Sequence, residues 1–166
     1  MNNAEVNYGK KYYKFSKSSP EVSNFTYEKN FWDYQIGENI DPTDFGFSFV
    51  PEDTILLCLQ YGDILNCITI PSNVQIKYRG LYWQESAAVK VNVLWQKSLR
   101  EVETLKYLFR ISSNTIIHQA VMNGNNREFL NNMEFYETLE LWDEVRNILK
   151  YSWTQKDYDI VRELCK

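Results

Sequence analysis

Apolar residues alternate with polar or small residues along several short stretches of the first 97 positions. In "KYYKFSK", Tyr13 and Phe15 share one face while Tyr12 and Lys14 share the other, which is the period of a β-strand. The β-branched stretches that follow predict further strands: "DILNCITIP", "NVQIKYR" and "AAVKVNVLW". The first 97 residues are therefore predicted to form a small mixed β-sheet.

The stretch "FGFSFVPEDTILLCLQYG" predicts a strand that leads into a helix. Phe45, Phe47 and Phe49 alternate with small residues, so we expect all three rings on one face, filling the core. Pro51 suits the first turn of a helix, and Gly62 suits a left-handed residue that ends it.

The pattern changes at Ser98, where a three- to four-residue spacing replaces alternation. Ser98 and Glu101 have the spacing of a capping box, and apolar residues follow at helical intervals. Polar breaks divide the remaining sequence into about five short helices. We therefore predict an α+β protein, with a strand-rich module in residues 1–97 and a helical region in residues 98–166.

The helical region contains a weak repeat. Residues 115–133 align with residues 147–165 at an offset of 32, and both segments keep the same apolar stripe. A period near 33 residues with two helices per unit resembles the ankyrin family. The first copy also matches the ankyrin consensus at four positions: Thr115, His118, Ala120 and Gly124.

The ankyrin resemblance implies a role for each of these four residues. The Thr115 and His118 side chains would stabilise the turn before the first helix through hydrogen bonds. The small Ala120 side chain would let the two helices approach closely. Gly124 would supply a left-handed cap between them. Because an array needs about three repeats, we expect these helices to share a core with the strand-rich module.

Six short motifs in the rest of the chain resemble those of uncharacterised proteins of giant DNA viruses of the mimivirus group, many of which carry an N-terminal domain before ankyrin repeats. They are "YYKF", "FTY", Gly37 with Asn39, "GFSF", Tyr61-Gly62 and "ITIP". The resemblance implies the architecture, a viral origin and a site of action in a host cytoplasm. It implies no defined biochemical role.

Charge and composition narrow the classes of partner. The net charge is −4, shared equally between the two parts, which argues against a general nucleic-acid or membrane surface. The lysines of "YGKKYYKFSK" fit either a nucleic-acid patch or, as we favour, an edge strand protected from aggregation. Three cysteines without a secretory signal or a membrane-length apolar run predict a cytoplasmic protein with reduced thiols.

The sequence offers no catalytic, cofactor-binding or metal-binding constellation. Its one histidine lies in the ankyrin-like turn, and the cysteines do not have the spacing of metal ligands. The stretch around Phe47 and Tyr61 is similar to a segment of ADP-ribosyltransferases that frames the NAD pocket. A NAD-binding or inactive relative of those enzymes is therefore one alternative, and a structural homo-oligomer is another.

We favour a non-enzymatic protein-interaction module whose partner the sequence does not identify. The interaction candidates comprise four glutamates at helical spacing and two tryptophans large enough to serve as anchors. They are Glu134, Glu137, Glu140, Glu144, Trp142 and Trp153. Core packing is the default expectation for the tryptophans, and a solvated face is the default for the acidic stripe.

Overall fold

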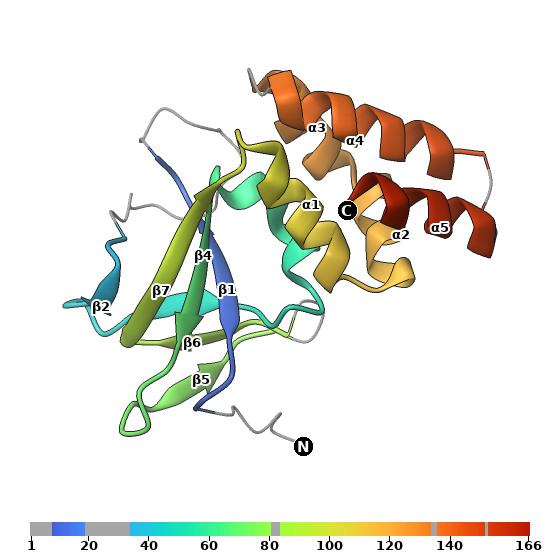
Figure 1. The fold of residues 1–166 in the computed structure, drawn as a ribbon. Helices are drawn as coiled ribbons and strands as arrows, with labels where there is room; N and C mark the ends of the chain where they lie inside the picture. The colour runs from blue at the N-terminus through green and yellow to red at the C-terminus, as the bar shows by residue number, and fades with distance from the viewer. Residues whose placement is uncertain (1–7, 19–33, 81–83, 134–135, 152) are drawn as a thin grey trace.

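The fold is given by a computed structural model that describes residues 8–18, 34–80, 84–133, 136–151 and 153–166. Figure 1 shows strands gathered on one side of the molecule and helices on the other. The predicted α+β class is confirmed. Glu134 and the "FTY" motif lie outside the described residues.

The strands form two antiparallel sheets instead of the one mixed sheet that we expected. The larger sheet has the order β1-β4-β7-β2, built from Tyr12–Ser16, Ile64–Thr69, Lys90–Ser98 and Gly37–Ile40. The smaller sheet has the order β3-β6-β5, built from Phe47–Phe49, Ser86–Ala88 and Ile76–Tyr78. Every pairing among these strands is antiparallel.

The two sheets close around a small apolar interior. Tyr13 and Val50 exchange backbone hydrogen bonds of 2.8 and 2.9 Å, which joins the end of β3 to β1. On the other side, β6 continues into β7 through Val89 alone. The enclosed cluster includes Phe47 and Phe49, both of which are buried.

Phe45 does not join that cluster, although we expected it to. Gly46 has a φ of 94°, a conformation that side chains other than glycine rarely adopt, and it breaks the strand alternation before Phe47. Phe45 is 71% exposed, and the Arg79 guanidinium lies 4.3 Å from the centroid of its ring. The aromatic strand therefore contributes two core rings and one surface ring.

A β-bulge lets β7 serve two different cores. Val93 pairs with Ile68, and Trp95 pairs with the adjacent residue Cys67, so Leu94 is the extra residue. Val93 faces the interior between the sheets, whereas Trp95 packs against the cluster on the helical side. The strand thus changes the face that it presents at Leu94.

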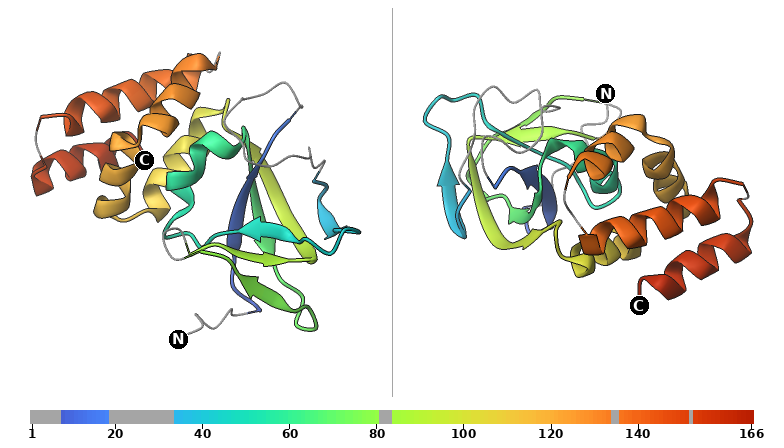
Figure 2. Two further views of the ribbon diagram at one scale, coloured as in Figure 1. Left: turned by 180° about the vertical axis from the view of Figure 1, so that it is seen from behind. Right: turned by 90° about the horizontal axis from the view of Figure 1, so that it is seen from above.

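The predicted helix after Pro51 is a short 3₁₀ helix, η1, at Ile55–Tyr61. Its first six residues are all buried, because it lies between the larger sheet and the helices (Figure 2). Gly62 is extended, with a φ of 168°, so the expected left-handed cap is wrong. Glycine is needed there because an added Cβ would lie 2.3 Å from the Ser16 carbonyl oxygen.

Five α-helices follow the last strand. They are α1 (Val102–Ile111), α2 (Asn114–Met122), α3 (Gly124–Asn132), α4 (Tyr136–Leu149) and α5 (Gln155–Leu164). One continuous buried cluster contains residues of these helices, of η1 and of the larger sheet, so the prediction of a shared core is confirmed. Asn126 of α3 reinforces the junction by donating a 3.2 Å hydrogen bond to the Leu56 carbonyl.

The expected capping box at Ser98 does not begin α1. Ser98 is the last residue of β7, and Glu101 occupies the N-cap position. The Ser98 hydroxyl accepts a hydrogen bond from the backbone N–H of Arg100, and its carbonyl accepts one from the Thr104 hydroxyl. Ser98 therefore fixes the turn between the sheet and α1.

Two arginines join the C-terminal ends of α1 and α5. Arg162 of α5 donates to the Phe109 carbonyl and, over 2.7 Å, to the Ser112 carbonyl at the end of α1. Arg110 of α1 donates to the Cys165 carbonyl at the end of α5 over 2.6 Å. Each helix thus supplies a hydrogen-bond donor to the unsatisfied carbonyls of the other.

Candidate functional site

The outer face of α4 carries a row of acidic side chains. Glu137, Glu140 and Glu144 are exposed and lie three or four residues apart, so they project from neighbouring turns of one helix face. None of the three has an ion-pair partner among the described residues. We call these three residues the acidic face.

Three other acidic side chains on the helices each have an ion-pair partner. Glu103 lies 3.4 Å from Lys106, Asp143 lies 2.7 Å from Arg146, and Glu163 lies 2.8 Å from Lys166. These i,i+3 pairs offset repulsion locally, whereas the acidic face leaves like charges adjacent to one another. The acidic face is therefore electrostatically unfavourable in the isolated molecule.

The opposite side of α4 is buried, and this corrects one of the predicted anchors. Trp142 is fully buried, and its ring stacks on Phe109 of α1 at 6.3 Å between centroids. It cannot contact a partner at the surface, so its default assignment to the core is confirmed. Val145 and Leu149 follow Trp142 at helical spacing on the same face of α4, and both are fully buried.

The connection between α4 and α5 presents aromatic side chains to solvent. Tyr151 is 82% exposed and Trp153 is 48% exposed. The Trp153 ring lies against the His118 ring of α2, and the Lys150 ammonium lies 5.2 Å from the centroid of the Tyr151 ring. Trp153 is thus available at the surface as an anchor candidate, and Tyr151 joins it although sequence reasoning did not select it.

The four ankyrin-like residues do not form the expected turn. Thr115 is exposed within α2, and His118 Nδ1 has no hydrogen-bond partner in the described part of the chain. The expected hydrogen bond from His118 Nδ1 to the turn before the helix is therefore absent there. Burial lowers the pKa of His118, which favours the neutral ring. Ala120 is fully buried, as close approach of helices requires.

Gly124 also departs from the ankyrin expectation. It is the first residue of α3, and its φ lies outside the left-handed region. Asn123 makes the junction between the helices, because its side chain accepts hydrogen bonds from the backbone N–H groups of Asn125 and Asn126. The predicted left-handed cap at Gly124 is wrong.

The 32-residue offset does not superpose one helix pair on another. It aligns α3 with residues 156–164, which belong to α5, but it aligns α2 with residues 146–154. The latter range contains the end of α4 and the connection to α5. The aligned apolar stripes therefore reflect helical periodicity in general, and the ankyrin-like repeat finds no support in the helix boundaries.

A polar cleft of about 220 Å³ lies where β1, β4 and β7 approach α1. Gln96 lines this cleft, and its Nε2 donates a 2.8 Å hydrogen bond to Oδ1 of the buried Asn66. Asn66 Nδ2 in turn donates to the Ser16 hydroxyl over 2.8 Å. The cleft is lined by Ser16, Lys17, Ser18, Tyr34, Ile64, Gln96, Lys97 and Ser98.

The cleft can hydrogen-bond a ligand through its polar side chains. These belong to three serines, two lysines, Tyr34 and Gln96, and Ile64 adds an apolar side chain. The buried Asp63 carboxylate nearby accepts hydrogen bonds from the backbone and the hydroxyl of Ser18. This arrangement fits structural support of the chain between β1 and β4 better than proton transfer.

The thiols are sequestered. Cys58, Cys67 and Cys165 are all buried and free of disulfides. Burial raises the pKa of Cys58 to about 12 and also raises the pKa of the other two thiols. Because the thiolate is the reactive form, none of them is suited to nucleophilic chemistry in the folded state.

The aromatic residues of the ADP-ribosyltransferase-like segment do not frame a common site. Phe47 lies in the cluster between the sheets, whereas Tyr61 packs against the cluster on the helical side. The larger sheet separates these two clusters. A NAD site built from both rings therefore has no geometric basis in this fold.

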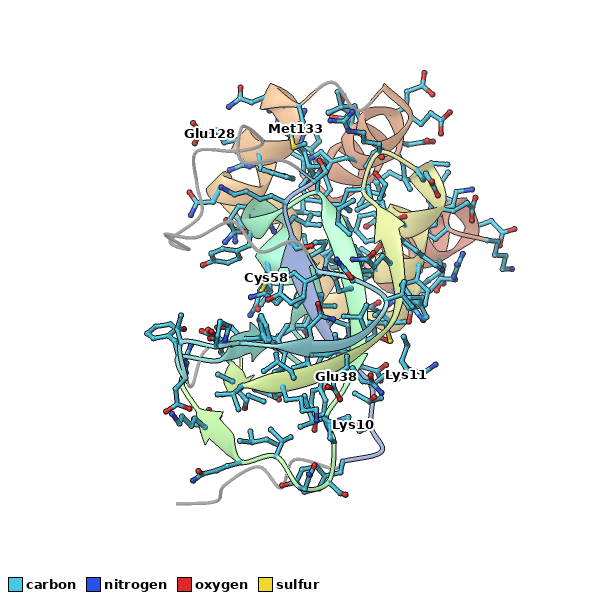
Figure 3. The ribbon with its side chains drawn as sticks, turned by 90° about the vertical axis from the view of Figure 1, so that its left-hand side faces the viewer. Lys10, Lys11, Glu38, Cys58, Glu128 and Met133 are labelled. Atoms are coloured by element: carbon cyan, nitrogen blue, oxygen red, sulfur yellow. The ribbon has the colours of Figure 1, made fainter. Side chains whose placement is uncertain are left out.

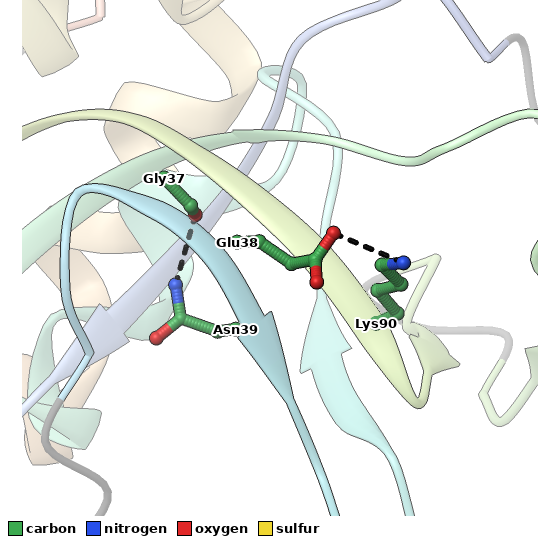
Figure 4. A network of polar contacts seen from close by, with 4 residues as sticks. All are labelled: Gly37, Glu38, Asn39 and Lys90. Atoms are coloured by element: carbon green, nitrogen blue, oxygen red, sulfur yellow. Dashed lines mark hydrogen bonds and ion pairs between the residues drawn. The ribbon is translucent and has the colours of Figure 1, made fainter.

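Lys10 and Lys11 of the strand-rich module lie away from the helices (Figure 3). Lys14, by contrast, is buried, with its ammonium 5.8 Å from the centroid of the Tyr34 ring. Lys90 pairs with Glu38 across β7 and β2 at 3.0 Å (Figure 4). The lysines therefore do not form one continuous row for a nucleic-acid strand.

The described residues contain no group of three or more histidine, cysteine or acidic side chains that could hold a metal ion. No helix in the same ranges is both long enough and apolar enough to cross a bilayer.

Comparison of the chain with protein-family models, with curated proteins and with solved structures found no significant match. The function must therefore be argued from the geometry of this molecule.

Proposed function

We propose that this protein is a non-enzymatic interaction module that binds a basic protein surface through the acidic face of α4 and the neighbouring aromatic residues. The observation that carries the proposal is the set of three exposed, unpaired carboxylates at Glu137, Glu140 and Glu144. Adjacent like charges destabilise a helix, and a partner that carries lysine or arginine would relieve that repulsion.

The aromatic residues give the same region an apolar component. Tyr151 follows the C-terminal end of α4, and Trp153 lies two residues later. Tyrosine and tryptophan are enriched among the residues that dominate binding energy, because they bury a large area with few rotatable bonds. The exposed fractions of 82% for Tyr151 and 48% for Trp153 leave most of the first residue and about half of the second available to a partner.

The experiment is a quantitative capture from host-cell extract, which the resemblance to mimivirus-group proteins makes the first source to try. The 166-residue chain is immobilised at several densities, and retained proteins are measured at low and at high salt. We expect saturable retention that weakens as salt screens the carboxylates. A matched variant, Glu137→Gln/Glu140→Gln/Glu144→Gln, should lose most of the retention.

A second variant controls for net charge alone. Glu52, Asp53 and Glu128 are exposed residues away from the acidic face, and their triple amide variant changes the net charge by the same amount. It should retain the partner as the unmodified protein does. Trp153→Ala should weaken retention without changing its salt dependence. Retention that is not saturable, or that both triple variants lose equally, would overturn the proposal.

A further inference from the structure

Two aromatic rings on different elements form a right-angled corner at the junction of the sheet and α1. Trp95 lies on β7 and Tyr107 lies on α1. Their ring centroids are 5.5 Å apart, and the ring planes meet at 85°. Both residues pack against the larger cluster but are only partly buried, so part of each side chain remains accessible to solvent. We call this pair the aromatic corner.

A buried third ring holds the aromatic corner in place. The Tyr13 ring lies 6.2 Å from that of Trp95 and 6.3 Å from that of Tyr107, measured between centroids. The Tyr13 and Tyr107 hydroxyls share a 2.6 Å hydrogen bond. Burial and this hydrogen bond raise the pKa of Tyr13, so its hydroxyl stays neutral at ordinary pH. The Trp95 and Tyr107 rings are therefore held in a fixed orientation before any ligand binds.

The chain's own lysine already occupies the corner. The Lys97 ammonium lies 4.7 Å from the centroid of the Trp95 ring and 4.8 Å from that of Tyr107. Both distances are within the range at which a cation is attracted to an aromatic face. Lys97 is an exposed residue without an ion-pair partner in the described ranges, so its side chain can leave the corner.

We propose that the aromatic corner is a binding site for a methylated ammonium group, as carried by a trimethylated lysine of another protein, and that Lys97 competes for it. An unmodified lysine ammonium is strongly hydrated and loses that hydration on entering the corner. A trimethylammonium group is hydrated more weakly and offers methyl groups to both ring faces, so it fits this site better than the residue now in it.

The site is separate from the acidic face, and its test does not depend on the function proposed above. The experiment records two-dimensional ¹H–¹⁵N spectra of the 166-residue chain and follows the indole N–H of Trp95. Tetramethylammonium chloride is titrated against equal concentrations of sodium chloride. A short peptide with one trimethyl-lysine is then compared with the same peptide carrying unmodified lysine.

We expect a saturable shift of the Trp95 resonance with tetramethylammonium and with the trimethylated peptide. Lys97→Ala removes the competing ammonium group. It should increase the affinity for tetramethylammonium and for the trimethylated peptide by about two- to five-fold, the factor that one exposed cation–π contact represents. The unmodified peptide should bind far more weakly. No shift in the folded Lys97→Ala protein, an equal shift with sodium chloride, or equal binding of the two peptides would overturn the proposal.

Two variants of one residue separate the ring from its hydroxyl. Tyr107→Phe keeps the wall of the corner and loses only the hydrogen bond to Tyr13, so it should keep the binding. Tyr107→Leu removes the wall and should abolish it. Binding that survives Tyr107→Leu would overturn the proposal, and Lys97→Ala decides the question if the leucine variant does not fold.

Discussion

The two apolar clusters of this molecule are built differently. The smaller one lies between the two sheets and is made by strand residues and their connections. The larger one combines all five α-helices with η1 and with the outer side of the larger sheet. The strand-rich module therefore encloses a core of its own, whereas the helices complete theirs with residues from the first half of the chain.

This difference shows that the boundary near residue 98 divides types of secondary structure and does not divide two independent folding units. An interface between separate domains is usually more polar and smaller than a domain core. Here the junction consists of fully buried aliphatic side chains, among them Leu56 and Leu59 of η1.

The first prediction concerns residues 98–166 expressed alone. Without η1 and the larger sheet, the inner faces of α1 and α3 would be exposed to water, so we expect an unfolded chain. Thermal melts followed by circular dichroism should show no cooperative transition. A cooperative melt with dispersed NMR signals would show that the helices have a sufficient core of their own.

The second prediction compares one large side chain from each cluster. Trp142→Ala and Phe49→Ala should each destabilise the protein by roughly 3–5 kcal/mol, the usual range for emptying a buried aromatic site. Because β4 and β7 contribute to both clusters, each variant should still unfold in one transition. Urea unfolding measured by fluorescence and by circular dichroism would reveal two transitions if the clusters were independent.

The sequence predicted the elements whose local pattern agrees with their final surroundings. β1, β4 and β7 alternate as strands, and α4 shows its buried and acidic faces at helical spacing. Features that depend on distant backbone could not be predicted. The bulge at Leu94 appears only through the pairing of β7 with β4.

The candidate sites were predictable to a similar extent. Glu137, Glu140 and Glu144 were found because a single helix positions them. The aromatic corner was not found, because Trp95 and Tyr107 come from different elements and meet only in the folded chain. Tyr151 was missed because it lies just beyond the periodic pattern of α4.

The third prediction uses two glycines. Gly62→Ala would bring a methyl group to 2.3 Å from the Ser16 carbonyl oxygen and should destabilise the protein by about 1–3 kcal/mol as the backbone moves. Gly124→Ala meets nothing within 4 Å and should stabilise it by about 0.4–1 kcal/mol. Destabilisation by Gly124→Ala would instead favour the left-handed cap of the ankyrin interpretation. Chemical denaturation measures the free energy of unfolding of the two variants.

The fourth prediction concerns alkaline pH. Burial raises the Cys58 pKa from 9.0 to about 12, so the folded state keeps a proton that the unfolded chain releases. The stabilisation is complete below about pH 9 and is lost as pH rises toward 12, at about 1.4 kcal/mol per pH unit. Urea unfolding at pH 8 and pH 10 measures the loss. Cys58→Ala should show a shallower dependence, and an unchanged one would contradict this assignment.

The fifth prediction compares unpaired and paired acids on the helices. Glu140→Gln/Glu144→Gln removes an i,i+4 repulsion and should stabilise the protein by about 0.2–0.5 kcal/mol. Glu103→Gln removes the pairing with Lys106 and should destabilise it by a similar amount. Both effects should shrink in 1 M salt. A destabilising double variant would indicate that the acidic face is already neutralised within the molecule.

The hydrogen bonds that Arg110 and Arg162 donate between α1 and α5 couple local unfolding of the two helices. Arg162 and Arg110 each complete the last turn of the helix on which the other is located. If α5 detached, α1 would lose the donor that satisfies its final carbonyls, and those groups would have to recruit water. Fraying at the chain terminus is therefore coupled to an interior helix, and hydrogen exchange at the ends of both helices should proceed through one shared opening event.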